Sequence, residues 1–146
     1  MVDVVDKLTR SRMMRGIRSK HTSPEVKLRR ALHALGYRYR LHQKSLPGSP
    51  DLVLRKWNAV VEVHGCFWHR HQECRLAATP EDPTGSWAEK FTSNVARDKR
   101  NQAALLSLGW RVAIVWECAI RSQGEVVVAN LVGEWLRDGE KCAHFR

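Results

Sequence analysis

The stretch VEVHGCFWHRHQEC (residues 61–74) joins the end of an apolar run to an unusual density of reactive side chains. Its first residues complete AVVEVH (residues 59–64), which has the composition of a strand, and Gly65 ends that pattern. The stretch then supplies histidines, cysteines and the adjacent pair Phe67-Trp68 within a few positions. We therefore expect the chemistry of the protein to begin where this strand ends.

A closed metal site is the first of two interpretations of this stretch. Cys66, His71 and Cys74 bring thiolate and imidazole donors at short spacings, as a tetrahedral zinc site requires. A fourth ligand could come from Cys118, far along the chain, with Cys142 as a minor alternative and otherwise a free thiol. Four protein ligands would make such a site structural rather than catalytic.

A hydrolytic metal centre is the second interpretation, and it overlaps the first. Pro50-Asp51 precedes Glu62-Val63-His64 by about one strand and turn, so two carboxylates and an imidazole meet at one sheet edge. Oxygen ligands of this kind suit Mg²⁺, which keeps open positions for water and a phosphate. The pattern predicts a phosphodiester substrate.

The composition favours an anionic partner. The 146 residues contain 25 Lys and Arg against 15 Asp and Glu, a formal charge of +10, which points first to nucleic acid and second to an anionic membrane. No apolar run approaches the ~20 residues of a membrane span, and the first residues lack the core of a signal peptide. We expect a cytosolic, nucleoid-associated protein that does not bind membranes.

The pattern of elements predicts one α/β domain over residues 21–146, preceded by a basic arm over residues 1–20. The arm is interpreted either as a DNA contact or as a solvated tail. A helix is predicted from Ser23 to Leu35, and Thr22-x-x-Glu25 matches a capping box, which gives Glu25 a structural role beside any catalytic one.

Strands and two further helices complete the predicted domain. Antiparallel strands are expected at residues 37–42, 51–54 and 59–64, a buried strand at 110–116, and helices at 87–108 and 124–136. The last helix would turn Val127, Leu131, Val132 and Trp135 to the core. The order predicts a mixed sheet flanked by helices. The long helix also carries a polar face, interpreted as solvated, with Lys90, Asn94, Arg97, Asp98 and Asn101.

Four segments together carry a family resemblance: SLPGSPD (45–51), HGCFWH (64–69), NVARD (94–98) and LGWRVAIVWEC (108–118). On these segments the chain resembles the very short patch repair endonucleases, from the N-terminal arm to about Arg121. The resemblance implies the restriction-endonuclease-like fold of PD…(D/E)xK nucleases with an added zinc site. It also implies a Mg²⁺-dependent nick 5′ of the thymine in a T:G mismatch, the lesion left by deamination of 5-methylcytosine.

The resemblance implies roles for individual residues. Asp51 and the main-chain carbonyl of Val63 would hold Mg²⁺ at the scissile phosphate. His69 would be the base that activates water, His64 would contact the phosphate, and Asp98 would orient a histidine. A carboxylate on the second ring nitrogen strengthens an imidazole as a base, which agrees with these roles.

Other residues follow from the resemblance or depart from it. Glu25 matches an acid near the active site of the family. Glu62 is a departure, because a family member has an apolar residue there, and we expect it to bind Mg²⁺ directly or through water. The zinc ligands transfer as Cys66, His71, Cys74 and Cys118.

The resemblance also implies how the protein holds its substrate. Phe67, Trp68 and Trp87 would enter the base stack beside the mismatch, and Met14 would enter from the other groove. A buried position at the start of the helix is the alternative for Trp87. We expect the polar side chains of Lys90 and Asn94 to contact DNA as well.

Two other functions remain alternatives. A restriction-type endonuclease on the same scaffold would cut both strands without a mismatch. A non-catalytic zinc module that binds DNA would explain the charge and the cysteines, but would leave Asp51, His64 and His69 without a role. The expected partner is duplex DNA with a T:G mismatch, bound by a monomer, with mismatch-repair proteins as further partners by resemblance.

Overall fold

A five-stranded mixed sheet forms the centre of the protein, with strand order β1-β2-β3-β4-β5. The structure, a computed structural model, describes residues 21–78 and 85–146, so the predicted arm and Met14 lie outside the described residues. The first three strands are antiparallel, whereas β4 runs parallel to β3 and to β5. The strands are β1 (Arg40–Leu41), β2 (Leu52–Leu54), β3 (Ala59–His64), β4 (Arg111–Trp116) and β5 (Cys142–Phe145).

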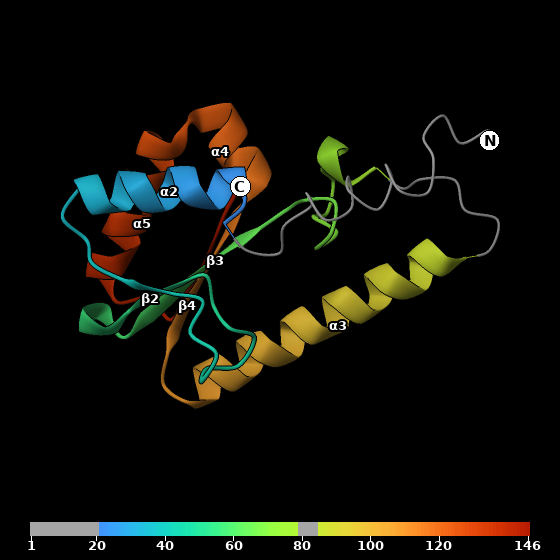
Figure 1. The fold of residues 1–146 in the computed structure, drawn as a ribbon, viewed down its shortest axis with the longest axis horizontal. Coiled ribbons are helices and arrows are strands. Elements are labelled where there is room, and N and C mark those ends of the chain that lie inside the picture. Colours follow the sequence, from blue (N-terminus) through green and yellow to red (C-terminus); the bar gives the residue numbers. More distant parts are fainter. Residues whose placement is uncertain (1–20, 79–84) are drawn as a thin grey trace, which may run out of the picture.

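Helices cover both faces of this sheet. Figure 1 shows α2 (Ser23–Ala34), α4 (Glu117–Gln123) and α5 (Glu125–Asp138) gathered on one side, and the long α3 (Ser86–Ser107) on the other. Each face has its own apolar cluster, the larger one beneath α2, α4 and α5. Among the described residues this arrangement is one α/β domain, as the sequence predicts.

The parallel pairing of β3 with β4 positions the site. His64 at the end of β3 lies opposite Trp116 at the end of β4, so the segments that follow both strands leave the sheet together. The residues after Gly65 therefore meet the start of α4, although about fifty positions separate them in sequence. Both strands are buried along most of their length, which fixes their register.

The described elements agree with most of the predicted ones. The three antiparallel strands, the buried fourth strand and the helices near residues 23, 87 and 125 are confirmed. The first strand is shorter than predicted, since only Arg40–Leu41 pairs with β2. Neither α4 nor β5 was predicted, because α4 follows β4 without a turn residue and β5 is a short, largely exposed edge strand.

Two local predictions are wrong. Thr22 makes no side-chain capping bond, and the Glu25 carboxylate accepts the His21 backbone N–H instead of that of Thr22. On α5 the predicted core residues Val132 and Trp135 are buried, but Val127 and Leu131 are 48% and 36% exposed, because α5 packs through the side of the helix that carries Val128. No helix within residues 21–78 and 85–146 has the length and apolar character needed to cross a membrane.

Candidate active site and metal-binding group

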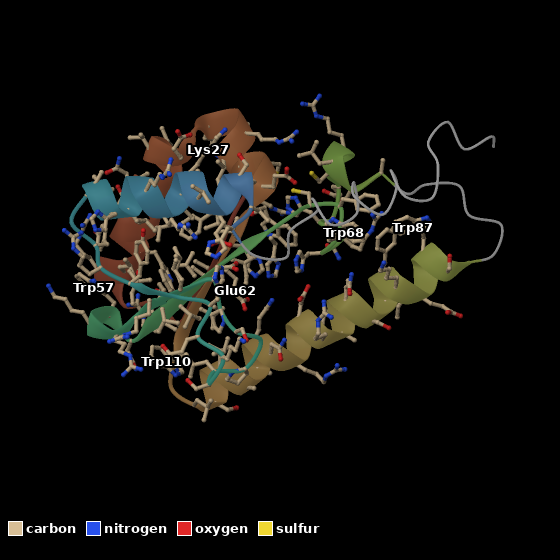
Figure 2. The ribbon with its side chains drawn as sticks, in the orientation of Figure 1. Lys27, Trp57, Glu62, Trp68, Trp87 and Trp110 are labelled. Carbon is tan, nitrogen blue, oxygen red and sulfur yellow. The ribbon has the colours of Figure 1, made fainter. Side chains whose placement is uncertain are left out.

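A cavity of about 1250 Å³ opens between the start of α2, the sheet edge and the middle of α3. Glu62 lies on the side of β3 that faces α3, near the centre of the molecule in Figure 2. Eight of the predicted site residues line the cavity: Asp51, Glu62, Val63, His64, Trp68, His69, Asn94 and Asp98. Residues distant in sequence thus converge on one open space.

Asp51 sits at the start of β2, where its carboxylate meets β3. Its Oδ2 accepts the backbone N–H of Val63 at 2.7 Å, and 18% of its side chain is exposed. Burial raises the pKa of Asp51 to about 8. The hydrogen bond from the Val63 N–H lowers this pKa, whereas the nearby carboxylates of Glu25 and Glu62 raise it further. A divalent cation would relieve this crowding of carboxylates.

Glu62 projects from the same side of β3 as His64. Its side chain is 11% exposed, and its Oε2 lies 3.6 Å from His64 Nε2. Because alternate residues of a strand share a face, both groups point to the α3 side and border the cavity with Asp51. The position of Glu62 therefore agrees with the predicted role as a ligand or a neighbour of one.

Two stacked imidazoles follow Glu62 in the cavity. The rings of His64 and His69 lie 3.9 Å apart and nearly parallel. His69 Nδ1 lies 2.6 Å from Asp98 Oδ2, so a carboxylate of α3 orients this ring. The polar face of α3 that was predicted to be solvated instead lines the cavity through Asn94, Arg97, Asp98 and Asn101.

Glu25 lies behind the cavity rather than on its wall. The residue is 1% exposed, and its carboxylate accepts hydrogen bonds from Arg29 at 2.8 Å and His42 at 3.1 Å. His42 borders the cavity and lies 3.6 Å from Asp51 Oδ1. Glu25 thus acts on Asp51 directly, by raising its pKa, and is also linked to the site through His42, which was not predicted to belong to it.

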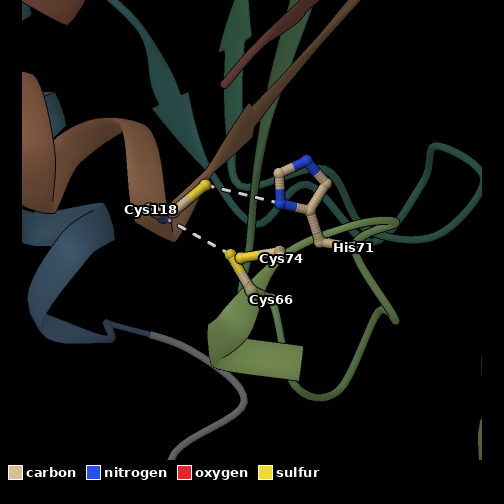
Figure 3. A group of neighbouring side chains, drawn as sticks. All are labelled: Cys66, His71, Cys74 and Cys118. Carbon is tan, nitrogen blue, oxygen red and sulfur yellow. Dashed lines mark hydrogen bonds between the residues drawn. The ribbon is translucent and has the colours of Figure 1, made fainter. Parts of the chain in front are cut away.

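Three cysteines and one histidine form a compact group at the ends of β3 and β4 (Figure 3). One donor atom from each of Cys66, His71, Cys74 and Cys118 lies within 4.8 Å of the others. Cys66 and His71 are buried, and His71 Nδ1 lies 3.4 Å from Cys118 Sγ. The group could hold a metal ion, whereas the alternative with Cys142 is wrong, because that residue is exposed on β5 and outside the group.

The residues of this group differ in how readily they ionise. Burial raises the pKa of Cys66 to about 12 and also raises the pKa of Cys118. Burial opposes ionisation of Cys74 as well, but the Leu76 backbone N–H and the adjacent thiols lower its pKa. Burial lowers the pKa of His71, which favours the neutral imidazole. Thiols lose their protons when they bind a metal, and three thiolates with a neutral imidazole are a donor set that Zn²⁺ accepts.

The predicted aromatic residues form a cluster of their own. Phe67 contacts Trp68, Trp87 and Phe91 at ring-centroid distances of 5.0, 5.6 and 5.2 Å. Phe67, Trp68 and Trp87 are partly buried, and Figure 2 shows the two tryptophans close together near the start of α3. Lys90 is exposed, with its Nζ 5.3 Å from the Trp68 ring.

Several cavity residues were missed from the sequence. His42 and Glu117 follow no motif, but Arg97 and Asn101 recur at helical spacing with Asn94 and Asp98. This spacing could have placed Arg97 and Asn101 in the site with Asp98, since residues three and four apart share one face of a helix. Asn94 also donates a hydrogen bond to the Trp68 carbonyl at 3.2 Å, which ties α3 to the loop after β3.

Comparisons with known proteins agree with this geometry. Residues 2–76 match the family model described as DNA mismatch endonuclease Vsr. The DNA mismatch endonuclease Vsr of Escherichia coli (strain K12) is 42% identical over 139 residues, which cover 93% of this chain and 88% of that protein. The type II nicking enzyme V.XorIIP of Xanthomonas oryzae pv. oryzae is 46% identical over 124 residues, covering 85% and 90%. V.NmeAIP of Neisseria meningitidis serogroup A, another type II nicking enzyme, is 42% identical over 123 residues, covering 84% and 87%.

Proposed function

Since the chain belongs to the Vsr family of DNA mismatch endonucleases, and so is an endonuclease that acts on DNA, we propose that it nicks one strand 5′ of the thymine in a T:G mismatch. The single observation that supports this most is the convergence of Asp51, Glu62, His64, His69 and Asp98 on one open cavity. The reaction is Mg²⁺-dependent hydrolysis of a phosphodiester, on the restriction-endonuclease-like fold.

The catalytic metal is held by Asp51, the main-chain carbonyl of Val63 and Glu62. The residues fit such an ion because Asp51 is held in place by the Val63 N–H at 2.7 Å, and its pKa is raised first by burial and then by the nearby carboxylates of Glu25 and Glu62. Mg²⁺ there supplies charge stabilisation at the scissile phosphate and a more acidic water. Glu62 supplies a second carboxylate on the same side of the cavity.

His69 is the base that removes the proton from the attacking water. Asp98 accepts a hydrogen bond from His69 Nδ1–H, which leaves Nε2 as the proton acceptor. His64, stacked on His69 and close to Glu62, contacts the phosphate. Glu25 acts at longer range, because it lies behind the cavity wall.

Zn²⁺ is the ion proposed for the cluster of Cys66, His71, Cys74 and Cys118. A closed site of four protein ligands is structural. It would fasten the loop that carries His69 to the first turn of α4, since Cys118 belongs to that helix.

Recognition of the mismatch is assigned to the aromatic cluster. Phe67, Trp68 and Trp87 wedge into the base stack, with Met14 entering from the opposite groove and Lys90 and Asn94 beside them on α3. Unstacking costs a few kcal/mol per step and least at a mismatch, so the wedge itself favours mismatched DNA. The protein acts as a monomer in the cytoplasm, and mismatch-repair proteins are its further partners.

The experiment that tests this function follows cleavage of a T:G duplex in Mg²⁺ and in EDTA, with Asp51→Ala beside the wild type. We expect cleavage only by the wild type and only with Mg²⁺. Binding of the duplex without cleavage would favour a non-catalytic zinc module, and cutting of both strands in matched DNA would favour a restriction-type enzyme.

A further inference from the structure

We propose that His42 is a positioning residue that holds the metal-binding carboxylate of Asp51 against the buried carboxylate of Glu25. This inference rests on the proposed function, in which Asp51 binds the catalytic cation. His42 belongs to no motif in the sequence, yet its ring lies between two carboxylates that the fold brings together from α2 and the start of β2.

The backbone conformation of His42 turns its ring toward Glu25 and Asp51. The residue follows β1 directly and has a φ of 45°, in the left-handed region that a histidine seldom adopts. Its backbone N–H donates to the Asp51 carbonyl at 3.1 Å, which ties the turn to the metal-binding residue itself. The side chain is only 8% exposed. A left-handed backbone conformation costs free energy in a residue other than glycine, and it persists where the surrounding contacts hold it, as they do around His42.

Glu25 is a fixed anchor for this ring. Its carboxylate accepts hydrogen bonds from the Arg29 guanidinium at 2.8 Å and the His21 backbone N–H at 3.1 Å. His42 Nε2 lies 3.0 Å from Glu25 Oε2 and 3.1 Å from Oε1. Because a carboxylate only accepts, Nε2 carries the proton in this contact.

The group of His21, Glu25 and His42 is better explained as this anchor than as a further metal site. Their donor atoms are close enough to hold an ion. However, Arg29 Nη1 lies 2.8 Å from both Glu25 Oε2 and His21 Nδ1, so a guanidinium already occupies the place of the cation. A metal ion there would meet that charge at contact distance.

Asp51 has neighbours on two sides, at different distances. Oδ2 accepts the Val63 N–H at 2.7 Å, whereas Oδ1 lies 3.6 Å from His42 Nε2, which is too far for a hydrogen bond, and the Nε2–H is donated to Glu25. The contact between His42 and Asp51 is therefore electrostatic, and it leaves the lone pairs of the carboxylate free for a cation. Without His42, Asp51 Oδ1 would lose this contact, and cation binding would have to order the carboxylate. Partners that orient a metal ligand typically contribute 10- to 100-fold in affinity.

Two substitutions separate this role from a general structural one. His42→Gln places an amide N–H near the position of Nε2, whereas the shorter His42→Asn does not reach it. Asn tolerates the left-handed region well, so His42→Asn is expected to keep the backbone conformation. Thermal melting of both variants checks that they fold like the wild type.

The readouts are the dissociation constant for Mn²⁺, followed by the free-ion electron paramagnetic resonance signal, and the Mg²⁺ dependence of T:G nicking. We expect His42→Asn to weaken Mn²⁺ binding and raise the half-saturating Mg²⁺ concentration by about 10- to 100-fold. The rate at saturating Mg²⁺ and the DNA affinity in EDTA stay near the wild-type values. His42→Gln binds Mn²⁺ nearly as tightly as the wild type.

The outcomes distinguish this inference from the proposed function. Asp51→Ala must abolish Mn²⁺ binding at this site, and retained binding would overturn the metal assignment itself. If Asp51→Ala abolishes binding while His42→Asn binds Mn²⁺ like the wild type, only the role of His42 is wrong. Equal weakening by Asn and Gln would also overturn it, because the Nε2–H would not be the group that matters.

Discussion

His69 Nδ1 lies 2.6 Å from Asp98 Oδ2, although 29 positions separate the two residues and they belong to different elements. The loop after β3 carries the histidine and the middle of α3 carries the carboxylate. The cavity opens beside this pair, so His69 is both oriented and accessible. An imidazole oriented in this way is equipped to accept a proton from water.

Asp98→Asn should slow cleavage without weakening DNA binding. The amide can donate to His69 Nδ1, which would leave the proton on Nε2 and remove the base. The loss should reach the 10²- to 10⁴-fold that general base catalysis supplies, measured as the single-turnover rate. Glu89→Gln, an exposed acid in the first turn of the same helix, is the matched control and should cleave normally. An unchanged rate in Asp98→Asn would remove the pair from the mechanism.

Mg²⁺ affinity should rise with pH up to about pH 8. Burial raises the pKa of Asp51 to about 8 in the metal-free protein, so below that pH a cation must displace a proton. The half-saturating Mg²⁺ concentration should fall about tenfold per pH unit between pH 6 and 8, then level off. Titrating Mg²⁺ in nicking assays from pH 6 to 9 measures this, and a flat profile contradicts it.

The same carboxyl should make the metal-free fold less stable as pH rises. In the folded protein the pKa of Asp51 is about 8, above the ordinary value of 3.8. The stability that this raised pKa gives the fold is therefore fully present below pH 3.8 and is lost as pH rises through 8. Asp51→Asn should therefore stabilise the metal-free protein at pH 8, by on the order of a few kcal/mol, since one pKa unit corresponds to about 1.4 kcal/mol. Denaturant unfolding at pH 5 and pH 8 tests this, and no gain at pH 8 would count against it.

Glu62→Gln should raise the Mg²⁺ requirement. The carboxylate lines the cavity near Asp51 and is 11% exposed, so neutralising it removes a charge that favours the cation. A loss of about 10-fold or more in Mg²⁺ affinity is expected for a ligand or its close partner. Glu134→Gln, exposed on α5, is the control for the change of charge. Unchanged Mg²⁺ dependence would show that Glu62 does not serve the metal.

Cys118→Ser should remove bound zinc, whereas Cys142→Ser should not. Cys118 belongs to the four-residue group with Cys66, His71 and Cys74, but Cys142 is exposed on β5. Loss of a structural zinc site should cost several kcal/mol, which lowers Tm by about 10 °C or more in a domain of this size. Elemental analysis and thermal melting of both variants measure this. Equal zinc content in the two would overturn the ligand assignment.

Trp68→Ala should reduce binding to T:G duplexes more than binding to matched duplexes. Stacking of one base on an aromatic ring contributes about 1–3 kcal/mol, and that contact forms only where the step can be opened. Trp110→Ala is the control, since Trp110 precedes the start of β4, at the end away from His64 and Trp116, and does not line the cavity. Fluorescence anisotropy with the two duplexes gives both affinities, and an equal loss on both would argue against a wedge.

The chemistry near residues 61–74 could be predicted because short-range spacing carries it. Thiol and imidazole ligands at positions 66, 71 and 74 lie in one loop, so their grouping needs little knowledge of the fold. Placing Cys118 beside them needed the family resemblance, since the parallel pairing of β3 with β4 is a long-range feature.

The parts that could not be predicted depend on tertiary contacts. The polar face of α3 has the same composition whether it meets water or a cavity, so Arg97 and Asn101 were assigned to solvent. His42 has no neighbours in sequence that suggest its role, and only its positive φ turns it toward Glu25. Similarly, β5 is too short and exposed for its composition to distinguish it from a loop.

The most direct test of the central claim maps the nick on duplexes labelled on both strands, matched or with one T:G pair, in Mg²⁺. The proposed function, which places catalysis in the cavity of Asp51, Glu62, His69 and Asp98 and recognition in the aromatic cluster beside it, predicts one product. That product is a single nick in the T-containing strand, 5′ of the thymine, with matched DNA left intact. Equal cutting of matched DNA, or cutting of both strands, would contradict this account.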